Sequence, residues 1–224
     1  MKISKINSKV LAVIPARKGS KRIVNKNIKK FNNVPIIAYS IKAAKKSKVF
    51  DYISVSTDCK KIAKIAKKYG ANIDFVRPKK ISNDKAKTLE VIKHSIKFYE
   101  NMGKKFDYIC CLYPSSPFIN PNNIKISLKR LKKQQTNFIF VVQEFSSPIQ
   151  RALTVENKKV KWVNKVYSSK NSNKLKKRYF DSGQFYFGTK KKFLSKGNLI
   201  DNKTDVIILE KHTSIDINDT RDWA

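Results

Sequence analysis

Up to residue 142, short apolar runs alternate with longer segments in which apolar residues recur at helical spacing. The runs are rich in Val, Ile, Phe and Tyr, and most are apolar at successive positions, as strands covered on both faces require. This pattern predicts strands over residues 10–15, 52–57, 72–76, 108–114 and 137–142.

The segments between these runs predict amphipathic helices. They are PIIAYSIKAAKKS, CKKIAKIAKKYG, AKTLEVIKHSIKFYENMG and PNNIKISLKRLKKQ. Leu89, Ile92 and Ile96 share one face of the third segment. Gly70 and Gly103 stand where the second and third helices need a C-terminal cap. The alternation predicts an α/β fold of three layers with a parallel sheet and right-handed crossovers.

The rhythm changes after residue 142. Residues 143–178 are polar, rich in Lys, Ser and Asn, and contain KKVKWVNKVYSS, which indicates a small hairpin. The sheet resumes with SGQFYFGT and DVIILE. We therefore expect a single domain over residues 1–224 with an inserted subdomain at about 143–178.

Composition favours a soluble, cytoplasmic protein. No run approaches the roughly 18 apolar residues of a membrane-spanning helix, and the first residues lack the apolar core of a secretory signal. Cys59, Cys110 and Cys111 follow no disulfide or metal spacing, so we expect buried, inert thiols. His94 and His212 are far apart and have no nearby cysteine, which argues against a zinc site.

The formal net charge of +34 raises the possibility of a nucleic-acid partner. However, lysines occur in almost every segment together with Asn and Ile, and they form no single basic patch in the sequence. This spread favours a general residue bias and no specific nucleic acid or membrane partner. A basic protein that binds RNA, another polyanion or a membrane surface is the alternative from another functional class.

The loop PARKGSKRIVNKN, residues 15–27, follows the first predicted strand. Ligands of open α/β sheets bind beyond the carboxyl ends of the strands, so this loop is a candidate site. It has neither Walker nor dinucleotide-binding spacing, but its cations surround the small pair Gly19-Ser20. Backbone amides there and the long cations can bind phosphate, although a solvated loop remains the plain alternative.

The stretch IPARKGSKRIVNKNIKKFNNVPIIAYSIKAA resembles the signature of the CMP-sugar synthetases, cytidylyltransferases that activate nonulosonic acids such as sialic acid. Further matches follow in VSTDCKKIAKIAKKYGANIDFVRP, YPSSPF, DSGQFYFG and SIDINDTRDW, so the resemblance spans residues 10–223. Lys18 stands where the family has glycine. The resemblance implies a Rossmann-like nucleotidyltransferase fold, mainly parallel, with the insertion as a small dimerisation subdomain in a homodimer. A monomer with a flexible polar excursion is the alternative.

The resemblance also implies the residues that bind the nucleotide. Arg17 and Lys21 would contact phosphates and act as the catalytic pair by stabilising charge at the reacting phosphate. Arg77 and Thr88 would contact the cytidine, although Arg77 could instead be a surface arginine that holds a loop. The full implied nucleotide set is Arg17, Ser20, Lys21, Lys26, Asn27, Arg77 and Thr88.

Two motifs direct the resemblance towards pseudaminic acid. Tyr113 stands where enzymes for sialic acid show Gln, and DSGQFYFG is similar to the motif of the pseudaminic acid branch. Tyr113, Gln184 and Tyr186 would then contact the sugar, with a plain strand of inward-packed aromatics as the alternative. Sialic and legionaminic acids remain open as substrates, and the shorter acid KDO is the next choice.

A triphosphate substrate implies Mg²⁺, which takes oxygen ligands. Asp216 matches the metal aspartate of the family, and Asn218 stands where a second aspartate is usual. Asp219 and Asp222 are expected to cap a terminal helix that begins at TRDW. Asp58, after the second predicted strand, is expected to cap a helix and is a weaker candidate for the site. The implied reaction is attack of the sugar acid's anomeric hydroxyl on the α-phosphate of CTP, with pyrophosphate leaving. The sequence identifies no general base.

Overall fold

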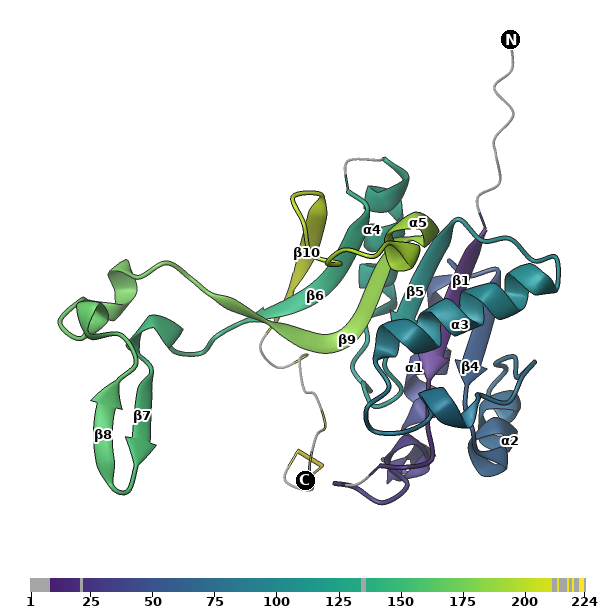
Figure 1. The fold of residues 1–224 in the computed structure, drawn as a ribbon, viewed down its shortest axis with the longest axis horizontal. Coiled ribbons are helices and arrows are strands. Elements are labelled where there is room, and N and C mark those ends of the chain that lie inside the picture. The colour runs from purple at the N-terminus through teal and green to yellow at the C-terminus, as the bar shows by residue number, and fades with distance from the viewer. Residues whose placement is uncertain are drawn as a thin grey trace, which may run out of the picture.

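A computed structural model describes residues 9–20, 22–133, 136–210, 213, 217, 219, 222 and 223. Its centre is a six-stranded sheet of order β10-β6-β9-β5-β1-β4 (Figure 1). The strands are β1 (Val10–Pro15), β4 (Tyr52–Ser56), β5 (Tyr108–Leu112), β6 (Phe138–Glu144), β9 (Tyr179–Thr189) and β10 (Thr204–Leu209).

The sheet is mainly parallel, as predicted. β1 pairs in parallel with β4 and β5, and β10 pairs in parallel with β6. β9 lies between β5 and β6 and runs antiparallel to both. Phe185 and Phe187 of β9 are fully buried, so this antiparallel strand contributes side chains to the core.

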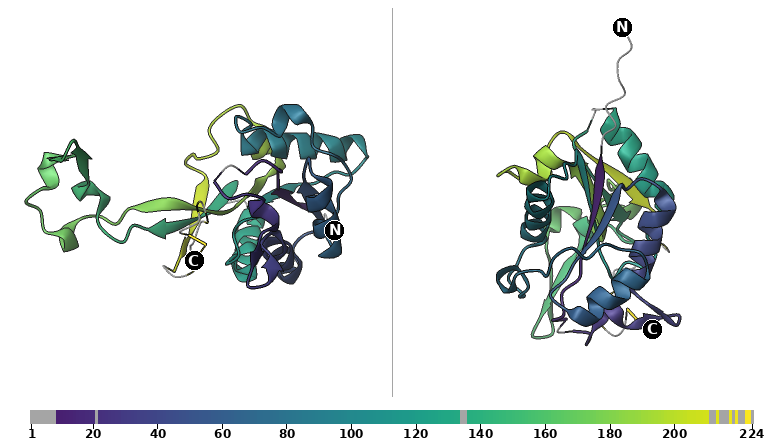
Figure 2. Two further views of the ribbon diagram at one scale, coloured as in Figure 1. Left: turned by 90° about the horizontal axis from the view of Figure 1, so that it is seen from below. Right: turned by 90° about the vertical axis from the view of Figure 1, so that its right-hand side faces the viewer.

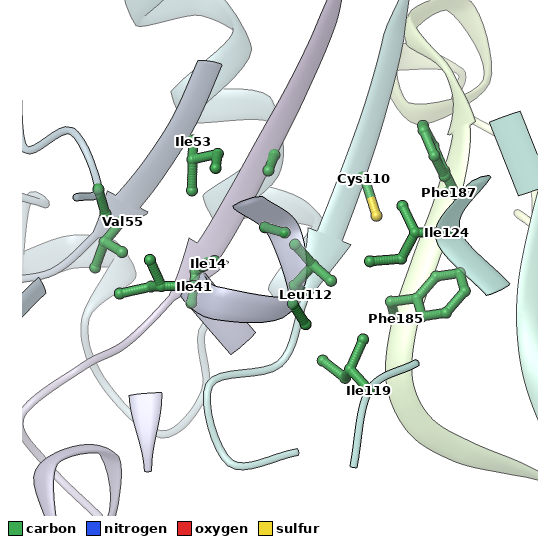
Figure 3. Close-up of a cluster of buried hydrophobic side chains, with 14 of the residues drawn as sticks. Ile14, Ile41, Ile53, Val55, Cys110, Leu112, Ile119, Ile124, Phe185 and Phe187 are labelled. Carbon is green, nitrogen blue, oxygen red and sulfur yellow. The ribbon is translucent and has the colours of Figure 1, made fainter. Parts of the chain in front are cut away.

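Helices cover both faces of the sheet, which confirms the three layers (Figure 2). Alternate side chains of β1 point to opposite faces: Ala12 and Ile14 join one core cluster, and Leu11 and Val13 join the other. The first cluster, part of which Figure 3 shows, includes apolar residues of α1, α2 and α4. The second includes those of α3 and α5. The helices are α1 (Ile37–Ser47), α2 (Lys60–Lys68), α3 (Thr88–Asn101), α4 (Pro121–Lys132) and α5 (Lys190–Leu194).

The predicted strand at residues 72–76 is wrong. Only Asn72 makes a bridge, to Ser54 of β4. The chain then leaves the sheet because Asp74 accepts hydrogen bonds from the hydroxyls of Tyr52 and Tyr99, at 2.7 and 2.8 Å. A short apolar run around one aspartate therefore forms an anchored loop, which leads into the segment that carries Arg77.

The insertion contains the predicted hairpin. β7 (Leu153–Glu156) pairs with β8 (Lys159–Trp162) through a turn in which Asn157 and Lys158 both have positive φ, the geometry of tight hairpins. Figures 1 and 2 show this part of the chain projecting from the sheet, beyond the C-terminal end of β6 and the N-terminal end of β9. We call residues 145–178 the arm.

Short elements complete the described chain. β2 (Lys30–Phe31) pairs with β3 (Val34–Pro35), and single 3₁₀ turns lie at Lys26–Ile28, Lys79–Ile81, Ile149–Arg151, Lys165–Tyr167 and Ser172–Lys174. Gly70 and Gly103 have φ of 88° and 73° just beyond α2 and α3, which confirms the predicted caps.

The structure shows how far the cysteine thiols are buried and whether a described helix could span a membrane. Cys110 and Cys111 are buried in β5, whereas Cys59 is half-buried. Within the residues that the structure describes, no helix has the length and apolar character needed to cross a membrane.

Candidate active site

The loop after β1 is fixed at the carboxyl ends of the parallel strands. The carboxylate of Asp58, just after β4, accepts a hydrogen bond from the backbone N–H of Lys18 at 2.8 Å. The Asn27 side chain donates to the carbonyl of Arg17 at 2.9 Å. The expectation that Asp58 caps a helix is wrong: residue Cys59 occupies the N-cap position of α2, and Asp58 instead shapes the loop.

A first cavity of about 420 Å³ lies between this loop and the N-terminus of α3. Six predicted nucleotide ligands line it: Arg17, Ser20, Lys26, Asn27, Arg77 and Thr88. Pro15, Arg22, Ile23, Asp84, Ala86, Val91, Tyr113, Pro114 and Ser115 complete the lining. Lys21, the other predicted catalytic residue, lies outside the described residues. One strand-end cavity thus gathers residues that are far apart in the sequence.

Among the residues that line the first cavity, Arg77 is unusual in its burial and in its hydrogen bonding. Its side chain is buried, with 4% exposed, and Nε and Nη2 have no hydrogen-bond partner among the described residues. Burial lowers its pKa, the charge of Asp58 opposes that change, and the charge of Arg17 adds to it. Because unpaired donors on a buried cation are costly, this guanidinium is suited to a ligand that brings hydrogen-bond acceptors.

The opposite wall is formed by the segment before α3. Asn83 accepts hydrogen bonds from the backbone N–H groups of Lys85 and Ala86 at 2.9 and 3.0 Å, which turns the chain into the helix. Asp84 forms an ion pair with Arg17 at 2.5 Å. Thr88 is the first residue of α3 and lines the cavity. The positive end of the helix dipole lies there, which favours an anionic ligand.

A second cavity of about 410 Å³ adjoins the first. Thr88 and Tyr113 line both cavities, and their hydroxyls are hydrogen-bonded at 3.0 Å. The remaining lining is mostly apolar: Leu89, Ile92, Phe138, Phe140, Asp181, Tyr186, Phe193, Gly197, Asn198, Leu199 and Ile200. The Tyr113–Thr88 pair is thus the partition between a polar cavity and an apolar one.

The two predicted sugar-contacting tyrosines meet at this partition. The rings of Tyr113 and Tyr186 lie edge to face with centroids 5.7 Å apart. Burial raises the pKa of Tyr113 to about 12. Burial also raises the pKa of Tyr186, and its hydroxyl donates to Asp181. Both phenols are therefore neutral hydrogen-bonding groups over the ordinary pH range.

The family is decided by a match over nearly the whole chain. The family model described as Cytidylyltransferase matches residues 11–214. The chain belongs to this cytidylyltransferase family.

The names of individual relatives agree with this assignment of the chain to the cytidylyltransferase family. It is 38% identical to the pseudaminic acid cytidylyltransferase of Campylobacter jejuni subsp. jejuni serotype O:23/36 (strain 81-176), over 96% of this chain and 93% of that one. It is 29% identical to the CMP-N,N'-diacetyllegionaminic acid synthase of Legionella pneumophila subsp. pneumophila (strain Philadelphia 1), over 96% and 94%. Among solved structures, a CMP:2-keto-3-deoxy-manno-octonic acid synthetase complexed with CTP has the same fold, with a TM-score of 0.65 at 16% identity over 90% of this chain and 91% of that one.

Gln184 of the cytidylyltransferase lines neither cavity, although its carbonyl accepts a hydrogen bond from the backbone N–H of Tyr113 at 2.9 Å. It is 1% exposed, and its side-chain amide donates to the carbonyl of Thr213 at 2.6 Å. Its predicted contact with sugar stays a prediction, while its observed contact fixes the C-terminal segment against β9.

The predicted metal ligands Asp216 and Asn218 lie outside the described residues. Ile217, between them in the sequence, is buried against Ile23 and Ile36, and its carbonyl accepts a hydrogen bond from Lys26 at 2.6 Å. No cluster of three His, Cys, Asp or Glu that could hold a metal occurs within the described part of the chain.

The predicted caps of a terminal helix find little support in the same segment. Asp222 accepts a hydrogen bond from the backbone N–H of Asp219 at 2.9 Å, which forms a turn. Thr220 and Arg221, where that helix was expected to begin, lie outside the described residues.

Two acidic residues of the site were missed by the sequence analysis. Asp84 and Asp181 each line a cavity, and their partners are Arg17 and Tyr186. Asp181 directly precedes the SGQFYFG stretch, so its position in the sequence was a usable signal. Asp84 had none, because nothing in a single sequence links it to Arg17.

Proposed function

We propose that this cytidylyltransferase uses CTP to activate a nonulosonic acid, giving a CMP-sugar and pyrophosphate. Pseudaminic acid is the first candidate for the substrate. The observation that carries the proposal is the pair of adjoining cavities, one lined by cations and one mostly apolar, which meet at Thr88 and Tyr113. The 38% identity to a pseudaminic acid cytidylyltransferase supports the choice of acid. CMP-legionaminic acid synthesis is the second candidate, supported by the relative from Legionella, and sialic acid remains an alternative substrate.

The first cavity receives CTP. The cytosine ring offers carbonyl oxygen and ring nitrogen acceptors, and the unpartnered Nε and Nη2 of Arg77 are donors that can satisfy them. Ser20, Asn27 and Thr88 add polar contacts along the nucleotide. Arg17, Lys21 and Lys26 neutralise the triphosphate.

Asp216 and Asn218 are the residues that would hold Mg²⁺. Both carry hard oxygen donors, and Mg²⁺ usually takes few protein ligands together with phosphate and water oxygens. The hydrogen bond from Lys26 to Ile217 supports this assignment because it ties the residue between them to a side chain of the first cavity. When bound, the ion supplies positive charge to the phosphate oxygens.

The reaction is a single in-line displacement. The anomeric hydroxyl of the acid forms a bond to the α-phosphorus as the bond to the β-phosphate oxygen breaks, and the hydroxyl proton is released. Arg17 and Lys21 stabilise the charge on the phosphates, and Tyr113 and Tyr186 position the acid. No nucleophilic side chain is needed, since both substrates provide the reacting atoms.

We also propose that the enzyme is a homodimer and that the arm forms the contact between its two subunits. Leu153, Val155, Val160, Val163 and Val166 are all between 48% and 68% exposed, an unusual concentration of exposed apolar side chains. Trp162 is only half-buried and stacks under Arg151, with 5.8 Å from the guanidinium carbon to the ring centroid. A second copy of the arm is the partner that would cover this surface.

The test is pyrophosphate release by the purified protein with CTP and Mg²⁺ and with pseudaminic, legionaminic and sialic acids in parallel. We expect release with one acid, lost in Lys21→Ala and retained in Lys64→Ala, which changes an exposed lysine of α2 that lines neither cavity. Silence with all three acids but retained CTP binding would redirect the proposal to another acid. Silence without CTP binding, with salt-sensitive binding of RNA, would favour the polyanion binder.

A further inference from the structure

The packing of α1 and α2 brings together lysines that are far apart in the sequence. Ile41 of α1 and Ile62 of α2 belong to one buried cluster, so the apolar faces of the two helices pack into the same core. Lysines on their other faces line a hollow of about 390 Å³ that both helices form, together with Tyr69 and Gly70. We call it the lysine hollow, and its lysines are Lys42, Lys45, Lys46, Lys67 and Lys68.

Gly70 leaves room for the ammonium group of Lys45 in this hollow. A Cβ at residue 70 would lie 2.6 Å from Nζ of Lys45, so any side chain there would displace the ammonium group. Lys45 belongs to α1, and Gly70 follows the end of α2. On the wall formed by Tyr69, Nζ of Lys42 lies 5.5 Å from the centre of the aromatic ring. The ammonium groups of the two helices therefore converge on one place.

The lysine hollow holds more positive charge than its surroundings neutralise. All five lysines are exposed, and none forms a salt bridge within the part of the chain that the structure describes. Neither α1 nor α2 contains Asp or Glu. The dipole of a helix favours lysines in its last turn, but each helix end carries only about half a unit of negative charge. Two helix ends thus leave most of the charge of five ammonium groups unbalanced.

We propose that the lysine hollow is an anion site, separate from the active site, that binds a compact chain of linked phosphates. None of its lining residues lines the first or the second cavity. Linked phosphates carry several negative charges at close spacing, which matches ammonium groups gathered around one small hollow. Inorganic tripolyphosphate has this chemistry. A single strand of nucleic acid spreads its charge along a backbone and needs a groove of cations that follows it.

Two triple variants of equal net charge test the site. One changes three lysines of the hollow to glutamine, whose helix propensity is close to that of lysine. The other changes three exposed lysines of α4 that line neither the hollow nor the active-site cavities. The two sets are Lys45→Gln, Lys46→Gln and Lys67→Gln, and Lys125→Gln, Lys129→Gln and Lys132→Gln. Calorimetry with inorganic tripolyphosphate is done at about 0.15 M salt, where screening over about 8 Å limits the field of distant lysines.

We expect the hollow variant to bind tripolyphosphate about tenfold more weakly at one site, since three exposed ion pairs are lost, and the α4 variant to bind it like wild type. The first cavity is cationic as well, so Arg17→Gln is measured in parallel and should keep the binding that the hollow variant loses. Equal weakening in the two triple variants would mean attraction by the whole charge and would overturn the site. Loss in Arg17→Gln alone would overturn it too, and so would tighter binding of a single-stranded oligouridylate.

Thermal unfolding separates the site from a purely structural role of the lysines at the helix ends. If the hollow holds unbalanced charge, the hollow variant should unfold at a higher temperature than the α4 variant, because repulsion is relieved. Tripolyphosphate should raise the unfolding temperature of the wild type more than that of the hollow variant, because a ligand stabilises the state that binds it. A hollow variant that unfolds below the α4 variant would mean that the lysines serve the helix dipoles, and the proposal would fail.

Discussion

Arg17 and Asp84 form an ion pair across the first cavity, with Nη1 and Oδ1 2.5 Å apart. Arg17 is on the loop after β1, and Asp84 is on the segment before α3, so the pair joins the two walls of the cavity. The same guanidinium is the group that we assign to the phosphates of CTP. On this assignment, nucleotide binding would exchange the carboxylate partner of Arg17 for a phosphate partner.

This exchange predicts that Asp84→Asn binds CTP more tightly. Arg17 and Asp84 side chains are 32% and 39% exposed, so the pair is worth only about 0.2–1 kcal/mol, and its loss should tighten CTP binding by up to about fivefold. Isothermal titration calorimetry checks this. Asp205→Asn is the matched control because it breaks the remote exposed pair with Arg130. Weaker binding by Asp84→Asn would mean that Asp84 orients Arg17 for the nucleotide.

Arg77→Met should separate stability from binding. Met fills similar space without unpaired donors, so we expect the ligand-free protein to unfold about 2 °C higher or more. CTP affinity should fall at least about tenfold because the donors to the base are lost. Thermal unfolding and calorimetry measure the two effects, with Arg130→Met as the exposed control. A variant that melts lower and still binds CTP would contradict the assignment of Arg77 to the ligand.

Tyr113 predicts a loss of stability at alkaline pH. Its pKa rises from 10.0 to about 12 on folding, chiefly through burial. Between these values the unfolded chain has lost the proton and the native state has kept it, so the free energy of unfolding falls as pH rises. Tyr113→Phe should show a smaller fall between about pH 10 and about pH 12 in urea unfolding. The same slope in wild type and Tyr113→Phe, compared with Tyr167→Phe on the arm, would contradict this account.

The arm predicts a change of oligomeric state on surface substitution. Val155 and Val160 face each other across the hairpin and are 68% and 59% exposed. The double variant Val155→Asp and Val160→Asp should shift a dimer to a monomer in sedimentation velocity, because two charges cannot be buried unpaired between apolar surfaces. Val76→Asp, at a side chain that is 75% exposed outside the arm, should leave the dimer intact. A wild-type monomer at every concentration would refute the dimer.

The sequence was most informative where one rule acts over many residues. β1, β5 and β6 are continuous apolar runs, and burial on both faces leaves them little choice but the sheet centre. The run at residues 72–76 obeyed the same local rule and failed, because Asp74 is held by the hydroxyls of Tyr52 and Tyr99, a contact that depends on the folded arrangement.

The site divides in the same way. The cations of the β1 loop were recognisable from their own segment together with the family resemblance. The pair of Arg17 with Asp84, and the hydrogen bond from Lys18 to Asp58, join segments that only the fold brings together. Such partners follow from the sheet order, which a single sequence does not contain.

Strand β9 connects the arm to the second cavity. β9 begins where the arm ends, carries Asp181 opposite Val142 of β6, and continues to Tyr186 in the wall of the second cavity. In the proposed function, β9 therefore connects the arm to the cavity that we assign to the acid, while the residues that we assign to CTP belong to other elements. With the proposed dimer, we expect dilution below its dissociation constant to weaken the acid's affinity before that of CTP.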